Sequence, residues 1–123
     1  MEFGINQAIY LQIVDYLCET ILAGKWKEGE KIPAIREMAV NLEVNPNTVM
    51  RSYAYLQERN IIYNQRGIGF FVAEGGLAGT RRIKHADFVQ NTLPRLFKIM
   101  DLLEIGFEEL NQLYNQFKTK GSL

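Results

Sequence analysis

The residues that follow Pro46 carry the side chains best suited to contacting another molecule. Asn47 and Thr48 can each donate and accept hydrogen bonds, and Arg51, one helical turn further on, is a permanent cation with a planar set of donors. Such side chains at the start of a helix can reach base edges and phosphates in the major groove of DNA. Ser52 is expected on the same side of the helix, so the first predicted contact set is Asn47, Thr48, Arg51 and Ser52.

Two other places have residues that suit contact with a nucleic acid. Arg66 stands beside Gly67 in a short glycine-bearing turn. Glycine lets a backbone approach a duplex closely, and arginine is attracted by the negative potential of a narrow minor groove. Arg36, expected in the first turn of a different helix, could bind a backbone phosphate, a contact that adds affinity without reading sequence. We therefore add Arg36, Arg66 and Gly67 to the predicted DNA-binding residues.

The residues that other kinds of chemistry require are missing from the sequence. Cys18 is the single cysteine and His85 the single histidine, so neither a zinc cluster nor a Cys–His nucleophile can be assembled. We predict no catalytic residues, no metal and no cofactor, and the chain is not expected to be an enzyme. One cysteine, no signal peptide at the start and no long apolar run together predict a cytoplasmic protein without a membrane partner.

The overall charge gives no support to DNA binding. Lys and Arg together number 14 and Asp and Glu together number 14, whereas nucleic-acid binders often have a basic surplus. Only local stretches are basic: residues 45–73 contain three arginines and one glutamate. The balanced charge keeps open the alternative of a winged-helix module that contacts proteins and does not bind DNA.

Local signals predict the helices that position these side chains. Asn45 suits a helix N-cap and Pro46 the first helical position, so a helix is expected from there to about residue 59. Apolar residues recur every four positions from 9 to 21, which predicts an earlier helix that stops before Gly24. A short helix is expected between them, after Pro33.

A β-hairpin is expected after the third helix. Residues 61–63 and 70–72 are β-branched or aromatic and flank the glycine-bearing turn. The order helix, helix, tight turn, helix, hairpin is that of a winged helix-turn-helix, a mainly α fold with a small β-hairpin wing. Residues 75–80 include three glycines and predict a linker.

The tail beyond the linker is expected to form two helices with an apolar stripe. Pro94 should start a helical segment or kink a longer helix. Two short helices cannot bury such a stripe alone, so we expect an interface between two copies, with an effector pocket as the alternative. The predicted dimerisation residues are Leu93, Leu96, Phe97, Met100, Leu103, Leu110 and Tyr114.

Several segments, in order, resemble the GntR family of bacterial transcription regulators. IPAIREMA (32–39) resembles the family's LPSxRxLA, VNPNTVMRSY (44–53) resembles VNPNTVxRAY, and RGIGFFV (66–72) resembles RGxGTFV. The opening IYLQI (9–13) also resembles the family's first helix. Together these matches run from about residue 8 to residue 73.

The resemblance has three departures. Ala34 stands where serine is common, which removes a helix cap and a phosphate contact. Asn60 replaces the usual glycine after the helix that is expected to begin at Pro46, and asparagine also tolerates left-handed geometry. Phe70 replaces a small polar residue of the wing, where it could pack on the domain or shield the wing.

The resemblance implies a DNA-binding homodimer that regulates transcription. We expect it to act as a repressor at an operator with two half-sites, with activation as the alternative. The short tail resembles the YtrA subfamily, in which it serves dimerisation, and is expected to exclude the larger effector domains. A small-molecule effector remains an open alternative. The expected organisation is a winged helix-turn-helix over residues 1–74, a linker over 75–80, and a helical dimerisation or effector region over 81–123.

Overall fold

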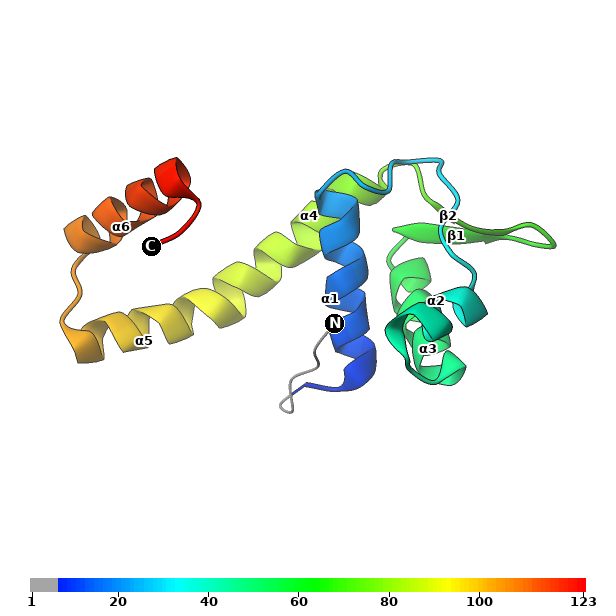
Figure 1. Ribbon diagram of the computed structural model, residues 1–123, viewed down its shortest axis with the longest axis horizontal. Coiled ribbons are helices and arrows are strands. Elements are labelled where there is room, and N and C mark those ends of the chain that lie inside the picture. Colours follow the sequence, from blue (N-terminus) through cyan, green and yellow to red (C-terminus); the bar gives the residue numbers. More distant parts are fainter. Residues whose placement is uncertain (1–6) are drawn as a thin grey trace. The chain divides into compact units, whose positions relative to one another are not determined.

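The computed structural model describes residues 7–123 and divides into two compact units. The first unit ends at Ile83 and the second comprises Lys84–Leu123. Figure 1 shows helices in both units and a hairpin in the first. Across residues 7–123, none of the helices has the length and apolar content needed to cross a membrane.

Three helices build the first unit, as predicted. They are α1 (Ile9–Leu22), α2 (Ile35–Leu42) and α3 (Pro46–Glu58), and both α1 and α2 pack against α3. Helix α3 begins where the sequence predicts, with Asn45 as N-cap and Pro46 in the first turn. Helix α2 has Ala34 as its N-cap and no side-chain cap hydrogen bond, as expected from the missing serine.

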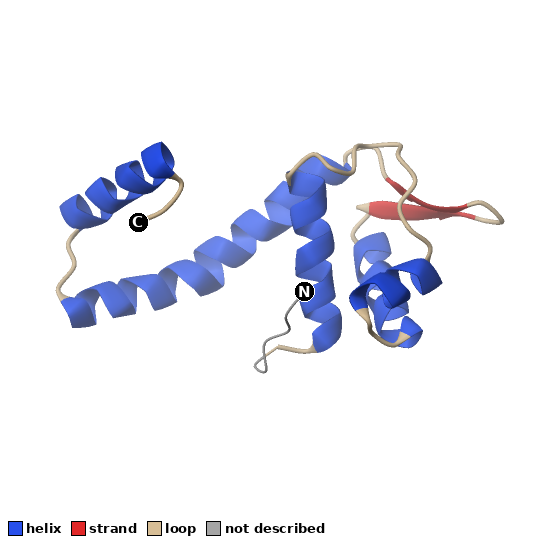
Figure 2. Ribbon diagram, viewed as in Figure 1, coloured by secondary structure: helices blue, strands red, loops and turns tan. Residues whose placement is uncertain are grey.

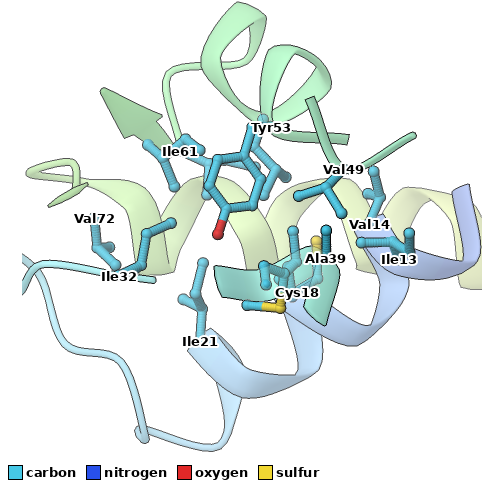
Figure 3. Close-up of a cluster of buried hydrophobic side chains, with 14 residues drawn as sticks. Ile13, Val14, Cys18, Ile21, Ile32, Ala39, Val49, Tyr53, Ile61 and Val72 are labelled. Carbon is cyan, nitrogen blue, oxygen red and sulfur yellow. The ribbon is translucent and has the colours of Figure 1, made fainter. Parts of the chain in front are cut away.

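The core of this unit lies between the three helices and the hairpin. Apolar residues at helical spacing on α1 and α3 meet there, and Figure 3 shows Tyr53 pointing from α3 into this cluster. The Tyr53 hydroxyl donates to the Pro33 carbonyl at 2.6 Å, so its polar end is satisfied although the residue is fully buried. The largest fully buried apolar partners are Ile13, Leu17, Ile21, Ile32, Leu56, Ile61 and Ile62.

The predicted hairpin is confirmed and has a third segment beside it. Strands β1 (Ile62–Gln65) and β2 (Gly69–Val72) pair antiparallel, with Ile62 opposite Val72 (Figure 2). The amide of Ile32 donates to the Phe70 carbonyl, and the amide of Val72 donates to the Glu30 carbonyl. Residues 30–32 therefore run along the free edge of β2 and hold the wing against the domain.

Two of the departures noted above have clear structural outcomes. Asn60 has φ 59°, so it occupies the left-handed conformation expected at this turn. The ring of Phe70 packs edge-on against Tyr53, with ring centroids 4.9 Å apart. Phe70 therefore packs on the domain, which decides between the two roles considered for it.

The segment predicted to be a linker is helical. Helix α4 (Gly76–Asp87) begins immediately after Gly75, and Gly76, Gly79 and Thr80 are buried. A Cβ atom at Gly76 would lie 2.7 Å from the Ile61 carbonyl oxygen. The linker prediction for residues 75–80 is therefore wrong. Glycine here allows a helix to pack closely on the residue that precedes β1. Local composition cannot distinguish a glycine used for close packing from a glycine used for flexibility.

The second unit consists of helical segments with a proline between them. The π-helical turn η1 (Phe88–Thr92) is followed by α5 (Leu93–Leu103), which has Pro94 in its first turn, and by α6 (Phe107–Lys120). Proline lacks the amide donor and crowds the preceding turn, so the wider π-helical turn just before it accommodates Pro94. The two tail helices expected from the sequence are thus α5 and α6.

Candidate nucleic-acid interface

The exposed start of α3 holds three of the predicted contact residues together. The Asn45 side-chain oxygen accepts a hydrogen bond from the amide of Asn47 at 2.8 Å and so fixes the first turn. Asn47 and Arg51 are exposed and Thr48 is half-buried. These three residues line one open hollow of about 300 Å³, whose other side is formed by residues 8–10 at the start of α1.

The guanidinium of Arg51 lies over the ring of Tyr10, with its central carbon 3.8 Å from the ring centroid. A cation over an aromatic face is attracted by the ring quadrupole, which restricts an otherwise flexible side chain. The α1 tyrosine therefore sits within the candidate interface, next to its main cation. Tyr10 is half-buried at the rim of the core.

The prediction that Ser52 contacts DNA is wrong. Ser52 has 0% exposure, and its hydroxyl donates to the Tyr10 carbonyl at 2.8 Å, with the Thr48 carbonyl at 3.1 Å. Ser52 lies on the side of α3 that packs against α1. It is four residues after Thr48, so helical spacing alone puts both residues near the boundary between the exposed and the buried face and does not assign Ser52 to either. Its role is to join the two helices beneath the exposed residues.

The turn of the wing carries Arg66 and Gly67 at an exposed tip. The amide of Ile68 donates to the Gln65 carbonyl at 2.9 Å and closes the turn, with Gly67 at φ 79°. The Ile68 side chain is 53% exposed. Figure 1 shows this turn extending beyond the helices of its unit. Arg66 and Gly67 are thus free to meet a surface such as a DNA groove.

Lys31 is a cation beside the wing that the sequence does not single out. It pairs with Phe71 in an isolated bridge, and its side chain crosses the wing at Gly69, where a Cβ atom would lie 2.9 Å from the lysine Cε. The exposed Lys31 therefore adds positive charge near the wing. The pairing of residues 30–32 with β2 is non-local, so only a prediction of that third segment could have found it.

Arg36 lies in the first turn of α2 and is exposed, as predicted. The predicted cations are therefore carried by three elements of the same unit: Arg36 on α2, Arg51 on α3 and Arg66 on the wing. Only Asn47, Thr48 and Arg51 line a common hollow.

The predicted dimerisation residues differ in exposure. Phe97, Leu103 and Tyr114 are 47%, 63% and 58% exposed, whereas Leu93, Leu96 and Leu110 are half-buried. Met100 is only 7% exposed in the single chain, so the prediction that it forms part of an exposed stripe is wrong. The α5 residues that face outward also include Ile99 and Leu102, at 47% and 82% exposure.

The described residues form no metal-binding cluster at this surface, and the tyrosine with a shifted pKa lies in the core. Within the part of the chain that the structure describes, His, Cys, Asp and Glu side chains form no group of three or more that could hold a metal ion. Cys18 is buried in the core. Burial, with a smaller contribution from the Glu37 carboxylate, raises the pKa of Tyr53 above its ordinary value, and this tyrosine serves the core rather than the surface.

Comparison with known proteins identifies relatives of the chain over the region that contains this surface. The family model for bacterial regulatory proteins of the gntR family matches residues 9–72. The HTH-type transcriptional repressor YtrA of Bacillus subtilis is 41% identical over 66 residues, which are 54% of this chain and 51% of YtrA. The matched stretch thus spans between half and three fifths of the length of such curated relatives. The family match over residues 9–72 contains Tyr10, Asn47, Thr48, Arg51 and Arg66.

Solved structures extend the likeness to the rest of the chain. A structure of a GntR-family regulator from Bacteroides thetaiotaomicron has a TM-score of 0.73 and 42% identity, and the match covers 94% of this chain and 100% of that one. The N-terminal domain of AraR in complex with mutant ORR3 has a TM-score of 0.53 and 28% identity, and covers 58% of this chain and 100% of that one. These relatives are transcriptional regulators rather than enzymes.

Proposed function

The chain belongs to the GntR family of bacterial regulatory proteins, and on that premise we propose that it is a sequence-specific DNA-binding repressor that acts as a homodimer. The observation that carries the proposal is the exposed N-terminal part of α3, where Asn47, Thr48 and Arg51 line one hollow. Amide, hydroxyl and guanidinium groups in this position match the hydrogen-bonding edges of bases in a major groove. The proposed location is the cytoplasm.

The wing and α2 supply the contacts that position the domain on DNA. Arg66 at the wing tip suits the minor groove, and Arg36 and Lys31 suit backbone phosphates. Phosphate contacts release counterions, so the affinity should fall steeply as salt rises despite the zero net charge of the chain. YtrA is described as a repressor, which supports the same direction of regulation here.

The second unit supports the homodimer. Helix α6 has 14 residues and no buried side chain, while its Phe107, Tyr114 and Phe117 are 75%, 58% and 51% exposed. An isolated helix of about this length is marginal in water and gains stability by covering an apolar face. A second copy of the chain would provide that cover, and two recognition helices would then meet half-sites about 10 bp, or a small multiple of 10 bp, apart.

DNA selection from a random-sequence pool tests the proposal. We expect the wild-type protein to enrich a two-half-site duplex and to bind it far more tightly than a random duplex. Arg51→Ala should relax this preference at the base pair that Arg51 reads, because one good arginine–guanine pair contributes about 1–3 kcal/mol of discrimination, or roughly 5- to 150-fold in affinity. Fluorescence anisotropy at several salt concentrations measures both affinities.

The matched control is Arg95→Ala, which removes the same charge from an exposed position on α5. It should leave the preference for the selected duplex unchanged. If the wild-type protein selects no sequence and binds DNA with little salt dependence, the DNA-binding proposal is wrong and the protein-interaction module becomes the better hypothesis.

A further inference from the structure

We infer that Tyr10, on the first turn of α1, is a positioning residue that orients Arg51 for DNA recognition. The inference rests on the proposed function and concerns a residue outside the recognition helix. Its starting observation is the stacking of the Arg51 guanidinium over the Tyr10 ring at 3.8 Å.

The backbone of Tyr10 is anchored to α3. The buried Ser52 hydroxyl donates to the Tyr10 backbone carbonyl at 2.8 Å, and Ser52 directly follows Arg51 in α3. This hydrogen bond ties the first turn of α1 to the same turn of α3 that carries the arginine. The point from which the ring projects is therefore fixed relative to Arg51, because the Tyr10 backbone is anchored to the helix that carries the arginine.

The stacking geometry leaves the arginine able to bind. A guanidinium stacked on an aromatic ring uses its flat face, while its five N–H donors lie in its plane and remain directed outward. Arg51 is exposed and lines the hollow together with Asn47 and Thr48, so these donors are offered on the same surface. An arginine that is already ordered loses less rotamer entropy when it binds a base or a phosphate.

The chain contains a second stack of the same kind that serves as a comparison. The guanidinium of Arg59, at the end of α3, lies 3.4 Å from the centroid of the Tyr55 ring, and its Nη1 also donates to the Tyr55 carbonyl at 3.0 Å. That stack joins residues one turn apart on a single helix. The Tyr10–Arg51 stack instead joins two helices, so the position of Arg51 depends on how α1 and α3 pack.

Three variants of the full chain test the inference on the duplex that the wild-type protein selects. Tyr10→Leu removes the ring and should weaken binding about two- to fivefold, the range expected for an exposed cation–π contact. Tyr10→Phe keeps the ring and should bind as the wild type does. Tyr16→Leu, an exposed tyrosine on the same helix, is the matched control and should also bind as the wild type does.

A double-mutant cycle separates positioning from general stability. In an Arg51→Ala background, measured at low salt so that binding remains detectable, Tyr10→Leu should have no further effect. The selection repeated with Tyr10→Leu should show relaxed preference at the same base pair that Arg51→Ala relaxes. Thermal unfolding of each variant reports whether the fold is intact.

Three results would overturn the inference. The first is a folded Tyr10→Leu protein that binds the duplex with wild-type affinity. The second is a Tyr10→Phe protein that binds as weakly as Tyr10→Leu. The third is a Tyr10→Leu substitution that lowers the affinity as much in the Arg51→Ala background as in the wild type. None of the three contradicts the proposed function if Arg51→Ala itself weakens the preference for the selected duplex. Absence of any preference in the wild-type protein would overturn both proposals.

Discussion

Tyr53 joins three parts of the first unit through one side chain. Its hydroxyl donates to the Pro33 carbonyl in the segment before α2, and its ring meets Phe70 of the wing. Burial is the main reason that its pKa is raised, and the Glu37 carboxylate adds to the effect because it disfavours a nearby phenolate. Tyr53 thereby fixes the orientation of α3 relative to both α2 and the wing.

Replacing Tyr53 with phenylalanine should destabilise the domain and change how its stability depends on pH. Near pH 7 the variant loses the hydrogen bond to Pro33 and should be about 1–3 kcal/mol less stable, since that carbonyl is left without its partner. Above the ordinary tyrosine pKa of 10.0 the unfolded wild-type chain releases the proton while the folded chain keeps it. Wild-type stability should therefore fall by up to about 1.4 kcal/mol per pH unit relative to the variant.

Urea unfolding at pH 7 and at pH 10.5 measures this difference. The difference in free energy of unfolding between the wild type and Tyr53→Phe should be smaller at the higher pH. The stabilisation by the protonated hydroxyl is fully present below pH 10 and is progressively lost above it. A gap that stays constant or widens would contradict the raised pKa.

At the scale of elements, the first turns of α4 are part of the DNA-binding unit. The Glu28 carboxylate accepts hydrogen bonds from the amides of Gly75 and Leu77, at 3.1 and 3.4 Å, and so caps the start of the helix. Gly76 packs directly on the backbone of Ile61 at the entry to the hairpin. The wing and α4 are consequently held by the same short segment of chain.

Two glycines of α4 give opposite expectations for substitution by alanine. Gly76→Ala places a Cβ atom 2.7 Å from the Ile61 carbonyl oxygen and 3.1 Å from a Val72 methyl, and should destabilise the unit by about 1–3 kcal/mol. Gly79→Ala meets its nearest atoms at 3.6 Å or more, an ordinary contact. It should stabilise the protein by up to about 1 kcal/mol, because alanine is the better helix former.

Urea unfolding of the two variants decides this comparison. The substitutions are chemically identical and lie three residues apart, so a general effect of alanine in α4 cancels between them. Equal stabilisation by both would show that α4 does not pack closely on Ile61.

At the scale of the whole molecule, apolar exposure is concentrated in the second unit. Ten of the sixteen exposed large hydrophobic side chains found among the described residues belong to Lys84–Leu123. Exposed apolar surface of this extent is typical of an interface. The division into two units therefore matches the proposed division of labour, with DNA recognition in the first and self-association in the second.

Charge placed on the exposed face of α5 should dissociate the proposed dimer. Phe97→Glu combined with Leu103→Glu puts two carboxylates where an apolar interface is proposed, and should weaken self-association by at least about tenfold. Affinity for the two-half-site duplex should fall as well, because two linked domains bind more tightly than one. Sedimentation equilibrium and anisotropy measure the two effects.

Val40→Glu is the control for this experiment. Val40 is 76% exposed on α2, in the other unit, so a carboxylate there should leave self-association unchanged. A doubly substituted α5 variant that remains as dimeric as the wild type would show that this face is not the interface.

The sequence by itself determined most elements of this protein, though not the start of α4, and it determined where α3 begins. Asn45 and Pro46 specify that start through local hydrogen bonding and a preset backbone angle, and Asn60 specifies the turn that follows through its tolerance of positive φ. Helical and strand periodicities are also local, so α1, α2, α3, the hairpin and the two tail helices could all be predicted.

Only the tertiary structure decided which polar side chains are exposed for binding and which glycines pack against a neighbouring element. Ser52 and Arg51 are neighbours in sequence, yet one is sealed against α1 and the other stacks on Tyr10 at the surface. Lys31 reaches the wing, and Gly76 packs on Ile61, through contacts between residues more than ten positions apart. Such contacts depend on how the elements pack. Rotating a helix about its axis by one residue would change these contacts but would leave the local sequence patterns that predict the helix unchanged.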